Sequence, residues 1–374
     1  MPNVVLWIVF LALCNVPFTR SSLCPVGCEC SEAAQTVKCV SKALRNIPTG
    51  IPAYTRILFI TGNHIGRIGP DSFTGLDNVT TLSLSNNRIS EVESYTFSSL
   101  HSLRSLDLSG NHLVVIHPEA FTIKSHVLRE LNLSKALYNH TSVTDLATAL
   151  RWSSLESLIE MDLSSNNLIY LPPRIFSYLS SLRYLQLTNN SIISINNETF
   201  LGLEQLDELD ISLNALKNFK EEGLSELDRM PRAKLHLGQN PYTCTCGIES
   251  FTTWLNTSHE RVVDVDHLVC MFPFELRNMS LLTEDTLELG CHLTGDSTNM
   301  VLQTSYVFLG IVLGFVGFMF LFVLYLNRKG IKKRVYDLRD TCREVWEGYH
   351  YRYEIDSDPR LSQVSTTADV QIGP

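Results

Sequence analysis

Eight cysteines form the two clusters in this 374-residue chain whose spacing suits metal binding or cross-linking. The spacings are C-x3-C-x-C-x8-C and C-x-C-x23-C-x20-C, and the residues are Cys24, Cys28, Cys30 and Cys39, then Cys244, Cys246, Cys270 and Cys291. Four thiolates can bind zinc, but in an oxidising compartment they form disulfides instead. The two ends of the chain indicate an oxidising compartment, so we predict disulfides and neither a metal nor another cofactor.

Four cysteines allow three pairings, and two cysteines separated by one residue can hardly bond to each other. We predict that the first pairs with the third and the second with the fourth in each cluster, giving Cys24–Cys30, Cys28–Cys39, Cys244–Cys270 and Cys246–Cys291. Cys342 stands apart from both clusters and is expected to be free.

A second chemical signal is a set of N-x-S/T sequons without proline in the middle position. They lie at Asn78, Asn132, Asn139, Asn189, Asn197, Asn256 and Asn278, all ahead of residue 294. This density in one segment predicts N-linked glycans on a secreted region.

Two apolar runs define the predicted topology. Residues 4–13 (VVLWIVFLAL) are too short to span a membrane and resemble the core of a signal peptide, here residues 1–22. Residues 306–326 carry no charge and would span about 31 Å as a helix, which matches a bilayer. A linker at 294–305 without basic residues precedes this run, and five basic residues follow it: Arg328, Lys329, Lys332, Lys333 and Arg334.

This charge asymmetry predicts a single-pass type I protein of the plasma membrane, with its N-terminus outside and a cytoplasmic tail at 327–374. The tail is too short for a folded domain, and we interpret its start as an amphipathic juxtamembrane segment.

Asparagines recur at an interval of 24 residues between the cysteine clusters, at Asn63, Asn87 and Asn111, and again at Asn166, Asn190 and Asn214. Aliphatic residues precede each one at fixed offsets, as in the L-x-x-L-x-L-x-x-N leucine-rich repeat. A phenylalanine series with the same interval predicts a stacked spine: Phe73, Phe97, Phe121, Phe176 and Phe200. We therefore predict an α/β solenoid with a parallel inner sheet, repeats at 54–240, an N-terminal cap at 23–53 and a C-terminal cap at 241–293.

About eight repeats are expected, with strands centred near residues 59, 83, 107, 132, 162, 186, 210 and 236. The fourth repeat is irregular, because Ala136 stands where asparagine is expected and extra residues follow near 135–157. We interpret that segment as a loop on the convex side or an edge. A neutral insertion is favoured over a dedicated binding loop.

The concave face is expected to present one residue from between the two central aliphatics of each strand, namely Phe59, Ser83, Asp107, Asn132, Asp162, Gln186, Asp210 and His236. Arg104, Arg129 and Arg183 lie beside them. Such a polar face can bind protein or simply be solvated. A glycan at Asn132 would obstruct its middle, which favours binding at the ends or along an edge.

Catalysis and nucleic-acid binding are not expected. The chain has no H-E-x-x-H, no G-x-S-x-G and no glycine-rich phosphate loop, and its net charge is −9. A repeat solenoid outside the cell is instead expected to bind other proteins. An adhesion or guidance receptor that works by contact between cells is the alternative.

Several blocks of the chain resemble the trophoblast glycoprotein family, namely CPVGCECSEAAQTVKC, IPAYTRILFITGN, QTSYVFLGIVL, NRKGIKK and EGYHYRYEIDSDPRL. The resemblance implies an inhibitor of β-catenin-dependent Wnt signalling. Its partner would be the low-density-lipoprotein-receptor-related Wnt co-receptor or another Wnt-pathway surface protein.

The resemblance also implies two partner-binding positions. A lysine before the last cysteine of the N-terminal cap matches Lys38, and a tyrosine after the third cysteine of the C-terminal cap is replaced here by Phe272. The ring is kept at the second position but the hydroxyl is lost. At the C-terminus, Ala368-Asp369-Val370 lacks the hydroxyl of a Ser-x-Val-like PDZ ligand and Gln371–Pro374 extends past it, so PDZ binding is not carried over.

Overall fold

The computed structural model describes residues 24–153, 155–282 and 297–357 of the chain. The predicted signal peptide, Cys291 and the C-terminal residues 368–374 lie outside this part. Residues 1–289 and 290–374 form two separate units. Each unit is described by itself.

The first unit is the predicted solenoid, with a ten-stranded inner sheet ordered β1-β2-β3-β5-β7-β9-β10-β11-β12-β13. β1 and β2 form an antiparallel hairpin, and every later pair is parallel. The strands are β1 (Glu29–Ser31), β2 (Thr36–Lys38), β3 (Ile57–Phe59), β5 (Thr81–Ser83), β7 (Ser105–Asp107), β9 (Glu130–Asn132), β10 (Glu160–Asp162), β11 (Tyr184–Gln186), β12 (Glu208–Asp210) and β13 (Lys234–His236). Eight of them lie within two residues of the predicted repeat strands, which confirms the eight-repeat array.

The return segments form the opposite wall of the solenoid. The strands β4 (Arg67–Ile68), β6 (Glu91–Val92) and β8 (Val115–Ile116) pair in parallel there. In the first repeat the 3-10 turn η1 (Pro70–Phe73) follows β4. Beneath this wall the phenylalanine spine is confirmed, with ring centroids 5.8 Å apart for Phe73–Phe97, 6.0 Å for Phe97–Phe121 and 6.4 Å for Phe176–Phe200. All five rings are fully buried. Stacked rings therefore hold consecutive turns at a constant spacing.

Each repeat asparagine bonds backbone groups of its own turn and of the turn before it. Asn111 accepts hydrogen bonds from the amides of Asn87 (3.1 Å) and Ile89 (2.9 Å) and donates to the carbonyls of Leu84 (2.9 Å) and Leu108 (2.7 Å). The other asparagines of the series make equivalent bonds across turns. Buried backbone groups must find partners, so this asparagine ladder allows the turns to close inside the core.

The irregular fourth repeat replaces the ladder bond with a backbone bond. Ala136 is fully buried, and its carbonyl accepts a hydrogen bond from the amide of Leu113 at 2.7 Å. The amide of Ala136 in turn donates to Asn166 at 2.8 Å. A small side chain at this position is tolerated because the main chain of the same residue supplies the missing acceptor.

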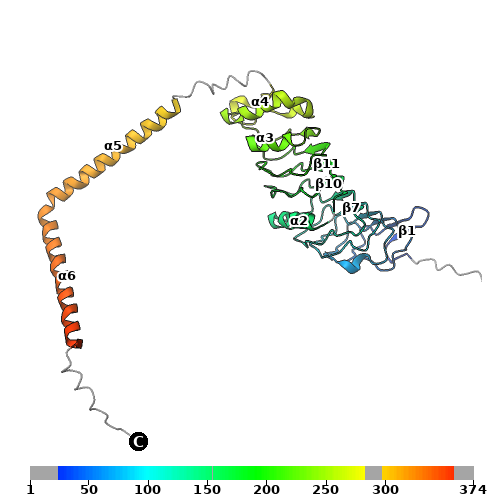
Figure 1. Ribbon diagram of the computed structural model, residues 1–374, viewed down its shortest axis with the longest axis horizontal. Helices are drawn as coiled ribbons and strands as arrows, with labels where there is room; N and C mark the ends of the chain where they lie inside the picture. Colours follow the sequence, from blue (N-terminus) through cyan, green and yellow to red (C-terminus); the bar gives the residue numbers. More distant parts are fainter. Residues whose placement is uncertain (1–23, 154, 283–296, 358–374) are drawn as a thin grey trace, which may run out of the picture. The chain divides into compact units, whose positions relative to one another are not determined.

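The interpretation of the insertion near 135–157 as a loop was wrong, because a helix, α2 (His140–Trp152), occupies most of it. Asn139 caps the helix by accepting bonds from the amides of Thr141 (3.0 Å) and Ser142 (3.1 Å). The helix buries Val143, Leu146, Ala149 and Leu150, which recur at helical spacing. The hydroxyl of Ser142 donates to the carbonyl of Leu113 at 2.7 Å, next to β8, so α2 extends the convex wall. Figure 1 shows α2 and α3 on the side of the array away from the labelled inner strands.

Disulfides close the N-terminal cap, at Cys24–Cys30 and Cys28–Cys39. In the C-terminal cap Cys244 is bonded to Cys270, Cys246 is also disulfide-bonded, and its predicted partner Cys291 lies outside the described residues. The final repeat and this cap contain α3 (Glu221–Asp228), η2 (Cys246–Ile248), α4 (Glu249–Ser258), η3 (His259–Arg261), η4 (Val265–His267) and η5 (Phe274–Leu276). The domain boundaries at 53/54, 240/241 and 293/294 stay predictions.

The second unit contains two helices, α5 (Ser297–Leu326) and α6 (Arg328–Ser357). The segment Phe308–Leu326 has a mean hydropathy of 2.6 and is long enough to cross a membrane. This agrees with the predicted span at 306–326. The helix itself begins at Ser297, inside the predicted linker at 294–305.

We expect Asn111→Ala to lower the free energy of unfolding of the first unit by about 2–4 kcal/mol, because each buried backbone group left without a partner costs roughly 1–3 kcal/mol. Denaturant unfolding of the purified first unit measures the change. The control is Asn196→Ala at an exposed site, which we expect to cost less than about 0.5 kcal/mol. Equal losses in the two variants would contradict the ladder's role.

The cap of α2 can be tested separately from its sequon. Asn139→Ala removes the capping oxygen and should destabilise the helix by about 1 kcal/mol, whereas Asn139→Asp keeps an acceptor there. Both variants lose the sequon, so only the cap differs between them. Amide hydrogen exchange over residues 140–152 should rise in the alanine variant alone, and a similar rise in both would assign the effect to the glycan.

Candidate functional site

The first predicted partner-binding residue, Lys38, ends β2 at one end of the inner sheet. Its side chain is exposed, and its ammonium lies 5.8 Å from the centroid of the Phe59 ring on the neighbouring β3. A shallow groove of about 470 Å³ runs beside it, lined among others by Ala34, Thr36 and Ile57. Lys38 therefore presents a cation above an apolar floor, where a cation–π contact restricts it.

The second predicted residue, Phe272, lies on a loop of the C-terminal cap. Its backbone is fixed, because its amide donates to the carbonyl of Tyr242 at 3.2 Å and its carbonyl accepts from the amide of Cys244 at 2.7 Å. Its ring does not pack into the cap, since the residue is 54% exposed, and Phe274 beside it is 77% exposed. The cap thus displays two aromatic rings to solvent from a rigid backbone.

The structure does not bring Lys38 and Phe272 together. Lys38 lies in β2, and Phe272 follows β13 eight strands further along the sheet. At about 4.8 Å per strand the two positions are of the order of 40 Å apart. No single small ligand can contact both, so together they can only belong to one extended interface or to two separate ones.

The concave face between them carries more charge than expected from the last residue of each strand. The first residue of each strand also points to this face, because side chains alternate along a strand. The missed residues include Glu130, Glu160, Tyr184 and Glu208, which are paired in register on neighbouring strands. The two-residue alternation of side chains along a strand was the sequence signal that could have identified these residues.

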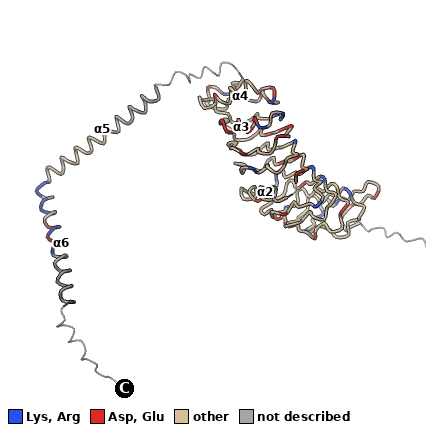
Figure 2. Tube along the Cα trace, viewed as in Figure 1, with Lys and Arg blue, Asp and Glu red and all other residues tan. Residues whose placement is uncertain are grey.

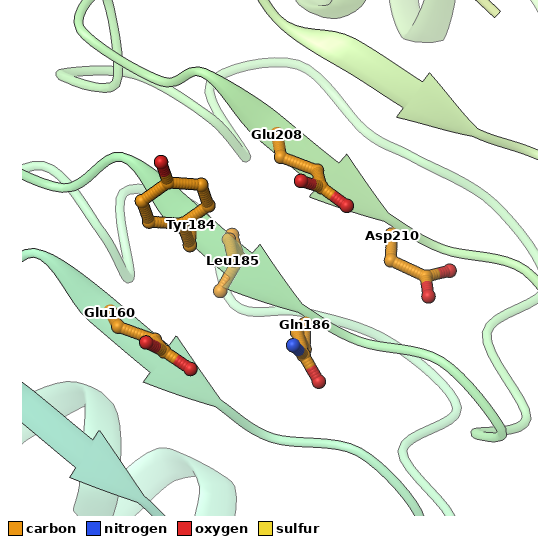
Figure 3. A pocket seen from close by; sticks show the side chains of 6 residues that line it. All are labelled: Glu160, Tyr184, Leu185, Gln186, Glu208 and Asp210. Carbon is orange, nitrogen blue, oxygen red and sulfur yellow. The ribbon is translucent and has the colours of Figure 1, made fainter. Parts of the chain in front are cut away.

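Six residues line a hollow of about 200 Å³ on this face: Glu160, Tyr184, Leu185, Gln186, Glu208 and Asp210. Figure 3 shows Tyr184 and Gln186 on the middle one of three strands, with Glu160 on one flanking strand and Glu208 and Asp210 on the other. A fourth carboxylate, Asp162, ends the same strand as Glu160. The middle of the concave face is therefore acidic, although no metal-binding group of three His, Cys, Asp or Glu side chains occurs among the described residues.

One of the arginines expected beside this face, Arg183, is paired with a carboxylate outside the hollow. Arg183 pairs with Asp207 at 3.1 Å, and Asp207 also binds Arg232 at 2.9 Å. The two arginines hold the pKa of the Asp207 carboxyl below its usual range. On the face itself His236 contacts Glu208 at 3.0 Å.

Partial burial raises the pKa of the Glu160 carboxyl above its ordinary value of 4.5, and the negative charges of Glu130 and Asp162 raise it further. The folded protein therefore holds a proton on this group at pH values where the unfolded chain releases it. Between the ordinary and the raised pKa, stability falls as pH rises. The acidic cluster therefore destabilises the folded state at neutral pH.

Asn132 lies between Asp107 and Asp162 on the concave sheet. Its side-chain oxygen accepts bonds from the amide (2.9 Å) and hydroxyl (2.7 Å) of Ser134. The sequon asparagines Asn78, Asn189, Asn197, Asn256 and Asn278 are exposed, whereas Asn132 and Asn139 are half-buried. A glycan on Asn132 would divide the concave face. Glycosylation of Asn132 stays a prediction, and it decides how much of this face a partner can reach.

We expect Glu160→Gln to stabilise the first unit at neutral pH, because the neutral amide removes the cost of partly burying a charge and the repulsion from Glu130 and Asp162. The gain should vanish as pH falls below the ordinary glutamate pKa, where the wild-type carboxyl is protonated in both states. Thermal melting at the two pH values measures it. Glu204→Gln removes the same charge at an exposed site outside this cluster, and an equal gain there would contradict the explanation.

Comparison with known proteins shows the family of this chain. The leucine rich repeat family matches residues 54–113, 128–192 and 180–241. Trophoblast glycoprotein from Homo sapiens is 46% identical over 363 residues, covering 93% of this chain and 86% of the relative. The Mus musculus protein is 39% identical over 383 residues, covering 96% of this chain and 89% of the relative.

A solved structure agrees in fold. The crystal structure of human 5T4 (Wnt-activated inhibitory factor 1, trophoblast glycoprotein) superposes with a TM-score of 0.64 at 37% identity, covering 70% of this chain and 96% of that chain. The similarity thus extends from the repeats over nearly the whole chain, and the chain belongs to the trophoblast glycoprotein family of leucine-rich repeat proteins.

Proposed function

We propose that this protein is a cell-surface glycoprotein that inhibits β-catenin-dependent Wnt signalling by contact with another membrane protein. The observation that carries the proposal is the display of Lys38 and Phe272 by the two caps of one rigid solenoid. The human relative, described as Wnt-activated inhibitory factor 1, supports the pathway.

The geometry favours a large partner. Two contacts of the order of 40 Å apart along one sheet suit an extended protein surface better than a peptide or a small molecule. The low-density-lipoprotein-receptor-related Wnt co-receptor is the partner we propose. Lys38 would supply a cation to it, and Phe272 would supply an apolar ring without the hydroxyl of the family's tyrosine.

The proposed placement is the plasma membrane, with the solenoid outside and α6 in the cytosol. The apolar helix Phe308–Leu326 supports a membrane anchor, and the basic residues directly after it support this orientation. Glycans on the exposed sequons and disulfides in both caps fit the same compartment.

Lys38→Ala should weaken inhibition in a β-catenin reporter assay when the protein is expressed in the Wnt-receiving cell alone. Truncating one charged contact of an interface costs about 1–2 kcal/mol, or roughly tenfold in affinity. Surface biotinylation must show equal surface amounts. Lys42→Ala, an exposed lysine of the same cap, is the matched control and should inhibit normally.

A companion variant tests the other cap. Phe272→Ala should weaken inhibition, whereas Phe272→Tyr, which restores the family's side chain, should not. Full inhibition by both Lys38→Ala and Phe272→Ala would refute the proposed contacts. Activity that requires expression on a neighbouring cell would favour the adhesion or guidance receptor.

A further inference from the structure

The helix α6 begins directly after the apolar span, with only Asn327 between α5 and α6. Two backbone bonds cross this junction, from the amide of Asn327 to the carbonyl of Val323 (3.0 Å) and from the amide of Ile331 to the carbonyl of Asn327 (2.9 Å). The first turns of α6 must therefore lie at the surface of whichever membrane α5 spans.

One face of α6 is apolar. Ile331, Val335, Leu338 and Cys342 follow at intervals of four, three and four residues, which places them on one stripe of a helix. Val335 is 60% exposed, Leu338 is 70% exposed, and Cys342 is an exposed free thiol. The second unit itself leaves this stripe uncovered, so it is available to an external surface.

Four basic residues border the stripe, and charges of both signs lie across from it. At about 100° per residue, Arg328, Lys332 and Arg339 fall along one border and Arg334 along the other. Lys329, Lys333, Asp337 and Asp340 fall on the far side. Figure 2 shows the basic residues gathered at the start of α6. This is the distribution of an amphipathic helix that lies in a membrane interface.

We propose that the Arg328–Arg343 part of α6 lies flat on the membrane surface, with its apolar stripe in the acyl boundary and its basic borders against anionic lipid headgroups. The charge complementarity is specific, because the cytoplasmic leaflet is the anionic one and attracts Lys and Arg next to a membrane helix. Cys342 then faces the lipid. In the cytosolic orientation proposed above, the tail is held to the bilayer along its first turns.

A second copy of the chain fits this face less well. Two copies anchored in one membrane can pair α6 only in parallel, with Ile331, Val335, Leu338 and Cys342 at the seam. That arrangement would set Arg334 of one copy beside Arg339 of the other, and like charges at such flanking positions oppose pairing. The basic borders therefore favour a lipid surface over a coiled coil.

The test uses the full-length protein in nanodiscs of phosphatidylcholine, with or without phosphatidylserine, and a fluorescent label on Cys342. We expect the label to be severalfold less accessible to an aqueous quencher when phosphatidylserine is present, and high salt should reverse this protection. Because both leaflets of a nanodisc have the same lipids, the result does not depend on orientation. It is also independent of the Wnt reporter assay.

Two matched variants test whether the protection depends on the apolar stripe or only on the overall charge of the helix. Leu338→Glu puts a charge on the stripe and should abolish the protection, whereas Tyr336→Glu, on the side of α6 away from the stripe, should keep it. Equal accessibility in the two lipids, or equal protection in both variants, would overturn the proposal. Protection without phosphatidylserine that needs two chains in one disc would also overturn it and indicate helix pairing.

Discussion

The fold depends on satisfying backbone groups in the interior of an open coil. Each turn of a solenoid leaves amides and carbonyls pointing inward where no strand partner exists, and such groups are costly when unpaired. The asparagine ladder meets this need with one side chain per turn, as in the four bonds of Asn111. The leucines and the phenylalanine spine can pack densely only because this polar requirement is met beside them.

Where the ladder is interrupted, the main chain compensates and the outer wall changes. Ala136 supplies its own carbonyl to Leu113, and α2 replaces the ordinary return segment of that repeat. A second exception lies near the end, where the fully buried Glu226 of α3 accepts bonds from the amides of Glu198 (2.9 Å) and Phe200 (2.8 Å). Helices thus enter the array at the two places where the regular interval fails.

The array was predictable from the sequence because one interval of 24 residues specifies strand, ladder and spine together. The helix α2 was not, since Asn139 has the pattern of a sequon and its role as a cap emerges only with the buried stripe of Val143, Leu146 and Leu150. Asn240 continues the ladder, with its oxygen 3.1 Å from the amide of Asn214, but α3 displaces it from the interval. Lys38 and Phe272 came from family resemblance alone, because neither charge nor spacing distinguishes them from other exposed residues.

The ladder also has a direction. Each asparagine serves the turn before it, and the series ends at Asp264 in the C-terminal cap, which accepts the amides of Leu237 (2.9 Å) and Gly238 (2.7 Å). Loss of that cap would leave backbone amides of the last repeat without hydrogen-bond acceptors. Unfolding of the last repeat would in turn leave amides of the preceding repeat without acceptors. We therefore expect proteolysis or reduction of the C-terminal cap to weaken the last repeat first.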